Sequence, residues 1–185
     1  MLALCCALAA VARADDAAVP AHNRADLTEA PARPPLGDAE AKARLLFDAI
    51  VADDPARATD FFFPRAAFLQ VKAMAHPERY YDRLRRRFDQ DIHELHRTTP
   101  DLDRARFTRL QLVPRGGWVE VGQEGNRLPY WACRHAWLDY SVDGKARRIE
   151  VRVLITWDDH WYVIHLSEFH GVRDEPTGRR EGGKG

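Results

Sequence analysis

The fold is decided by residues 130–157, which read YWACRHAWLDYSV, then DG, then KARRIEVRVLITW. In both long segments apolar side chains recur at about every second position, which is the period of a β-strand. Asp143-Gly144 between them is typical of a two-residue hairpin turn, because both positions must adopt positive φ. The stretch therefore predicts a long antiparallel hairpin that runs from Tyr130 to Trp157.

The turn also fixes the register of the hairpin, and the register sorts its side chains between two faces. Counting back from the turn places Arg134 opposite Val153. A further strand, from Trp161 to Phe169, continues the alternation and is expected to pair Ile164 with Val153. One face then collects the side chains expected to face the core: Ala132, Ala136, Leu138, Ile149, Val151, Val153, Ile155, Tyr162, Ile164 and Leu166.

The opposite face, called the outer face below, is also rich in large apolar side chains. It carries Trp131, Cys133, Trp137, Leu154, Trp161 and Val163, together with the polar His135, Arg152 and His165. Such a face needs cover, because burying one large apolar side chain is worth about 1.5–3 kcal/mol. We therefore predict a homodimer whose interface contains Trp131, Trp137, Leu154, Trp161 and Val163. The alternative is that the segment around Leu27 to Leu36, or the strand at Trp118, folds back over this face.

The chain ahead of the hairpin shows mainly the period of helices. The expected elements are helices at residues 39–50, 54–63 and 77–96 and strands at residues 107–113 and 118–121. Asp38 can cap the first helix, Asp54-Pro55 can start the second, and Pro64 stops it. The sequence therefore predicts an α+β fold in which three N-terminal helices pack on a curved antiparallel sheet.

Three helices followed by an antiparallel sheet with long final strands resemble the cone-shaped nuclear-transport-factor-2-like superfamily. The segment at residues 60–64 (DFFFP) and the closing turn at residues 157–163 (WDDHWYV) resemble the same layout. The resemblance covers residues 38–170 and implies a pocket on the core face. The superfamily includes ketosteroid isomerases, dehydratases, polyketide cyclases and non-catalytic ligand-binding or dimerisation modules, so it leaves the function open.

The two ends of the chain differ in composition from this central part. Residues 1–14 contain an uncharged run that ends at Ala12-Arg13-Ala14, which is typical of a signal peptide cleaved after Ala14. The run is too short to span a bilayer, so no integral membrane segment is expected in the mature chain. Residues 15–37 predict a disordered Ala/Pro-rich leader and residues 171–185 a disordered tail. Residues 38–170 then form one domain of a protein exported to the periplasm or secreted.

Charge and cysteine content give no sign of several common functions. Lys plus Arg and Asp plus Glu number 28 each, so no net charge would attract nucleic acid or an anionic membrane. Cys5 and Cys6 would leave with the signal peptide, and Cys133 is expected to be a buried apolar residue. The sequence has no phosphate-binding loop, nucleophile elbow or Cys-x-x-Cys motif, so no cofactor is predicted.

Arg134 fits its predicted surroundings least well of all the residues. It lies in mid-strand on the apolar face between two alanines, where an unpaired guanidinium is costly. It therefore requires either a ligand anion or a carboxylate, for which the candidates are Asp48, Asp60 and Asp91. In the first case Arg134 anchors a small or acidic ligand.

Two clusters of polar side chains are candidates for other sites: Asp89, His93 and His96 on the long helix, and His135, Arg152 and His165 on the outer face. The first cluster has a spacing that would suit a metal ion, but the same spacing is typical of a solvated helix flank, so no metal is predicted. The second could bind a ligand or supply groups that titrate near neutral pH, or it could form the polar rim of a subunit interface.

Catalysis has the weakest sequence support. Tyr162 with Glu168 or Asp60 is the pair that would suit acid–base chemistry on the core face. We therefore favour an exported, non-catalytic module that binds a small ligand or dimerises. The alternative is a lyase or isomerase that uses a tyrosine and a carboxylate in the pocket.

Overall fold

The computed structural model describes residues 18–167, which fold as α+β with helices preceding an antiparallel sheet. The predicted fold class is thereby confirmed. Within these residues the α-helices are α1 (Ala39–Ala52), α2 (Arg65–Val71) and α3 (Pro77–Thr98), and the strands are β1 (Ala105–Gln111), β2 (Trp118–Val119), β3 (Tyr130–Val142), β4 (Lys145–Trp157) and β5 (His160–His165). Short 3-10 helices are η1 (Ala21–Asn23), η2 (Pro55–Phe61), η3 (Leu102–Arg104) and η4 (Gln123–Gly125). The predicted signal peptide, the predicted tail and Glu168 lie outside the described residues.

The sheet is built around the predicted hairpin. Its strand order is β1-β3-β4-β5, and the short β2 pairs with the N-terminal end of β3. Asp143 and Gly144 both have positive φ, 48° and 77°, as a two-residue turn requires. Arg134 lies opposite Val153, so the register predicted for the hairpin is confirmed.

The register of β5 differs from the prediction after its first half. Leu154 pairs with Val163, but Val153, the residue before Leu154 in β4, pairs with His165 and not with Ile164. Ile164 is therefore an extra residue in the ladder, a β-bulge, and its predicted pairing with Val153 is wrong. Alternation alone could not reveal this bulge, because Ile164 is as apolar as its neighbours.

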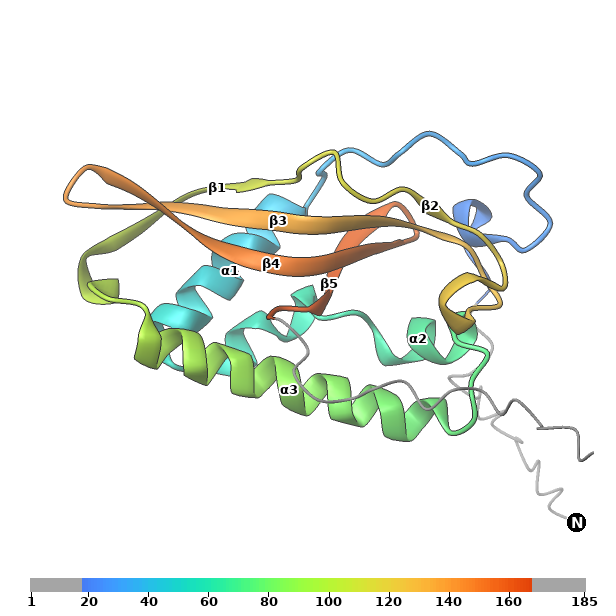
Figure 1. Cartoon of the computed structure of the whole chain (residues 1–185), viewed down its shortest axis with the longest axis horizontal. Helices are drawn as coiled ribbons and strands as arrows, with labels where there is room; N and C mark the ends of the chain where they lie inside the picture. Colours follow the sequence, from blue (N-terminus) through green and yellow to red (C-terminus); the bar gives the residue numbers. More distant parts are fainter. Residues whose placement is uncertain (1–17, 168–185) are drawn as a thin grey trace, which may run out of the picture.

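The helices cover one face of the sheet, as Figure 1 shows. The apolar stripe of α1 and the inner face of α3 are buried against the strands: Ala43, Leu46, Ile50, Leu84, Phe88 and Ile92. The second predicted helix is instead the 3-10 helix η2, and the helix α2 after Pro64 was missed. The chain leaves η2 in extended form because the Phe63 N–H donates to the carbonyl of Val163, 2.9 Å away.

Residues 20–37, called the strap below, cross the outer face (Figure 1, blue). The indole Nε1 of Trp131 donates to the carbonyl of Pro31 at 3.2 Å, and that of Trp161 donates to the carbonyls of Pro34 and Pro35 at 3.3 and 3.1 Å. The expectation that this leader is disordered is therefore wrong for the described part of it. A proline-rich composition removes helix and strand pairing, but it does not prevent a segment from packing.

The strap provides the cover that the outer face requires. The side chains of Cys133, Leu154, Trp161 and Val163 are 0% exposed within this single chain. Trp137 stays half-buried, with the Arg148 guanidinium 5.2 Å above its ring. Of the predicted homodimer interface, Leu154, Trp161 and Val163 are thus buried within the single chain, whereas Trp131 and Trp137 stay half-buried. The leader does fold back over this face, as the alternative prediction stated. Among residues 18–167 no helix has the length and hydropathy needed to cross a membrane.

Candidate functional site

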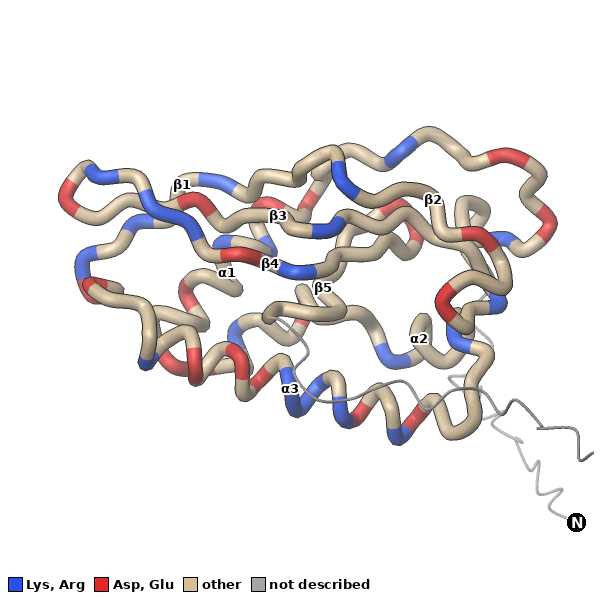
Figure 2. Tube along the Cα trace, in the orientation of Figure 1, with Lys and Arg blue, Asp and Glu red and all other residues tan. Residues whose placement is uncertain are grey.

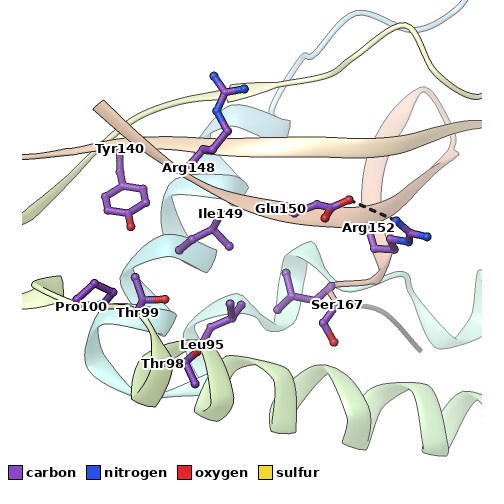
Figure 3. A pocket seen from close by; sticks show the side chains of 11 residues that line it. Leu95, Thr98, Thr99, Pro100, Tyr140, Arg148, Ile149, Glu150, Arg152 and Ser167 are labelled. Carbon is purple, nitrogen blue, oxygen red and sulfur yellow. Dashed lines mark hydrogen bonds and ion pairs between the residues drawn. The ribbon is translucent and has the colours of Figure 1, made fainter. Parts of the chain in front are cut away.

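A cleft in the described part of the chain lies between the C-terminal end of α3 and strand β4. Its volume is about 400 Å³, which is within the range of small-molecule sites. Figure 3 shows Tyr140 and Ile149 from the sheet facing Leu95 and Thr99 from the end of α3. The other lining residues are Thr98, Pro100, Arg148, Glu150, Arg152, Leu166 and Ser167.

The cleft exists because β5 accompanies only half of β4. The last backbone hydrogen bond between them joins the Arg152 N–H to the carbonyl of Leu166 at 3.2 Å. In an antiparallel ladder every second residue directs its N–H and C=O to the same side. The backbone groups of Arg148 and Glu150 therefore face the cleft, and within residues 18–167 no strand pairs with this edge of β4.

Three polar side chains meet at the rim where the paired part of β4 begins. The carboxylate of Glu150 forms ion pairs with His135 and, at 3.5 Å, with Arg152. Arg152 Nη1 lies 3.0 Å from His135 Nδ1. Glu150 thus holds the His135 ring in place.

His135 has a backbone conformation that is rare within a strand. Its φ is 64°, in the left-handed region, although it stands in the middle of β3. A residue other than glycine in this region costs about 1–3 kcal/mol, and such residues cluster at functional sites. His135 contacts Glu150 and Arg152, and both of these side chains also line the cleft.

A buried carboxylate adjoins the cleft on the α3 side. Asp91 is 2% exposed, accepts a hydrogen bond from the Ser167 N–H at 3.1 Å and lies 2.9 Å from Arg87 Nε. Burial raises the pKa of Asp91 above its ordinary value, and the contacts with Ser167 and Arg87 offset this only in part. Asp91 therefore holds Ser167, which also lines the cleft, against α3.

Arg134, the predicted ligand anchor, lies outside this cleft. Its side chain is 48% exposed and forms an ion pair with Glu124 of η4. The other carboxylate oxygen of Glu124 accepts a hydrogen bond from Tyr130 Oη at 2.9 Å, and Lys72 Nζ lies 3.4 Å from the same hydroxyl. The predicted partners Asp48, Asp60 and Asp91 are therefore wrong. Glu124 was missed because it stands in a loop whose path the sequence pattern does not indicate.

The predicted acid–base pair is not assembled in the described residues. Tyr162 packs edge-on against Phe63, and Lys42 Nζ lies 4.3 Å from the centre of its ring. Burial raises the pKa of Tyr162, and Asp60 is not among the charged groups that act on this hydroxyl in residues 18–167. Asp60 is instead exposed on η2. The third member, Glu168, lies outside the described range.

The three metal candidates on α3 each have a separate partner. Asp89 pairs with Arg85 at 3.0 Å, His93 pairs with Asp53 at 2.6 Å, and His96 bonds the carbonyl of Ile50 at 2.9 Å. No group of three His, Cys, Asp or Glu side chains in residues 18–167 could hold a metal ion. Figure 2 shows basic and acidic residues interspersed along α3. The solvated-flank interpretation is the one that fits these contacts.

Sequence reasoning found Arg152 and His135 but not the cleft beside them. The signal for the two residues was their position on neighbouring strands of one face. The cleft depends on where β5 stops accompanying β4, which the alternation does not mark. Comparison of the chain with protein-family models, curated proteins and solved structures found no match. The superfamily resemblance therefore stays an expectation from the sequence, and the function has to be argued from the site.

Proposed function

We propose that this protein is an exported, non-catalytic binding module that takes a small amphipathic anion in the cleft between α3 and β4. The observation that supports it is the composition of the cleft. Apolar groups of Leu95, Ile149 and Leu166 line its interior, and the guanidinium of Arg152 stands at its rim. This combination suits a ligand with an apolar body and one carboxylate, sulfonate or phosphate.

Arg152 can accept such a ligand without giving up its ion pair with Glu150. A guanidinium has five N–H donors in a planar fork, and the ion pair with Glu150 is long, at 3.5 Å. A ligand anion would therefore bind alongside Glu150 instead of replacing it. The backbone N–H groups of the open β4 edge, at Arg148 and Glu150, offer further donors in the same cleft.

A non-catalytic role is favoured by the chemistry of the rim. Glu150, the carboxylate that lines the cleft, is already engaged by His135 and Arg152. A general base needs a carboxylate or imidazole within reach of substrate and poised to take a proton. Here the imidazole and the carboxylate are engaged with each other.

The test is a titration of the purified protein with 8-anilinonaphthalene-1-sulfonate, an amphipathic anion whose fluorescence rises in apolar sites. Arg152→Met keeps the apolar stem and removes the charge, and we expect it to weaken binding about tenfold, as for the loss of one charge-assisted hydrogen bond. Arg134→Met is the matched control, since this half-exposed arginine lies outside the cleft, and it should leave the affinity unchanged. Equal affinities for both variants and the parent protein would contradict the proposal.

A further inference from the structure

The strap contains a short unit that proline chemistry holds in one conformation. Residues 31–35 read Pro-Ala-Arg-Pro-Pro. Each proline fixes its own φ, and a residue before proline is driven to extended or polyproline II backbone. Residues 33–35 are therefore pre-organised, and carbonyl groups of such a segment stay available because it makes no internal hydrogen bonds.

The outer face recognises this unit through two indole rings. Trp131 donates to the carbonyl of Pro31, and Trp161 donates to the carbonyls of Pro34 and Pro35. An indole N–H is a donor only, so each tryptophan requires an acceptor when it is covered. The spacing of the two rings thus matches a Pro-x-x-Pro unit.

The residue between the prolines is recognised as well. The guanidinium of Arg33 lies 5.1 Å above the ring of Trp161, which is cation–π geometry, and it also interacts with the thiol of Cys133. Pro34 itself is buried. Aromatic grooves that bind proline-rich segments use the same elements: indole donors, carbonyl acceptors and a pre-formed ligand.

We propose that the outer face is a recognition groove for a Pro-x-Arg-Pro-Pro segment, that the strap fills it in cis, and that a second copy of this chain can supply the segment in exchange. The second copy is the occupant to expect because its strap is the segment whose fit the contacts demonstrate. The strap joins α1 through Gly37, whose φ of 53° is a conformation that glycine adopts readily. A change at this hinge would redirect the strap to a neighbour with every contact preserved, which is the requirement for domain swapping.

The experiment traps the strap by a disulfide in the full-length chain. Cys5→Ser and Cys6→Ser leave Cys133 as the only native thiol, and Arg33→Cys puts a second thiol on the strap, at the residue whose side chain interacts with Cys133. Oxidation at low protein concentration should give a monomer with an internal disulfide. Oxidation after long incubation at millimolar concentration should give a covalent dimer on a non-reducing gel. Arg24→Cys is the control, since Arg24 contacts Asp26 instead.

Recognition of the proline unit is tested in the same background. Trp161→Phe removes the indole donor while keeping an aromatic ring. It should lower the yield of the disulfide between position 33 and Cys133 about fivefold at a fixed oxidation time. A disulfide that forms only within one chain at every concentration would overturn the exchange. A yield that Trp161→Phe leaves unchanged would overturn the groove itself.

Discussion

Asn23 is the polar anchor of the strap, and its replacement by alanine gives the sharpest test of how the strap is held. The side chain is 1% exposed. Its Nδ2 donates to the carbonyl of Pro129 at 2.8 Å, and its Oδ1 accepts from the N–H of Asp158 at 3.1 Å. One residue thus joins the strap to the loop before β3 and to the turn between β4 and β5.

The expected effect of Asn23→Ala follows from these two bonds. The substitution leaves one carbonyl and one N–H without their partner, and each such buried group costs about 1–3 kcal/mol. We therefore expect the free energy of unfolding to fall by about 2 kcal/mol or more. Arg24→Ala, next in the chain, removes only an exposed ion pair with Asp26 and should change it by less than about 0.5 kcal/mol.

Urea unfolding followed by tryptophan fluorescence measures both variants, because Trp131 and Trp161 lie under the strap. A second readout is the reaction of Cys133 with a thiol reagent in chains that carry Cys5→Ser and Cys6→Ser. Burial raises the pKa of Cys133 and keeps its thiol protonated and covered. Loosening of the strap should therefore speed the reaction. If Asn23→Ala is no more destabilising than Arg24→Ala and leaves the thiol rate unchanged, the strap does not cover the face as described.

Two further substitutions test the packing around the sheet. Gly116 has φ of 110°, and a Cβ there would clash with the carbonyl oxygen of Ala132. Gly116→Ala should therefore lower the free energy of unfolding, measured in urea, by about 2–4 kcal/mol. Gly117→Ala is the control, because its Cβ would meet nothing within 4 Å, and it should cost less than about 1 kcal/mol. Similar losses for both variants would contradict the close approach of Gly116 to Ala132. Burial raises the pKa of Asp91 in the folded state above its unfolded value of about 4. Between these two pKa values the folded state binds more protons than the unfolded state, so the free energy of unfolding declines as pH rises through this range. Asp91→Asn should abolish this decline, and a difference between the two proteins that does not vary with pH would refute the assignment.

The hairpin was predictable because its determinants are local. The Asp143-Gly144 turn fixes the register, and on either side of it the alternation continues with Arg134 as the exception, so the bounds of β3 and β4 agree with the prediction. The helix from Pro77 was predictable for the same reason, since its apolar face repeats without a break. In each case neighbouring residues carry the whole signal.

The remaining features depend on contacts between segments far apart in the sequence. The bulge at Ile164, the extended link after η2 and the ion pair of Arg134 with Glu124 are each set by a partner that local patterns do not indicate. The outer face shows the limit most clearly. Its apolar side chains indicated correctly that it must be covered, but the choice between a second subunit and residues 20–37 required the indole contacts of Trp131 and Trp161.

The central claim is that the cleft between α3 and β4 is the ligand site, and chemical-shift mapping tests it most directly. Titration of ¹⁵N-labelled protein with 8-anilinonaphthalene-1-sulfonate should move the amide signals of residues 95–99 and 148–152, with the largest shift near Arg152. The amides of Glu124 and Arg134 should stay in place. Shifts centred on Arg134, or shifts absent from both segments at saturating probe, would contradict the account.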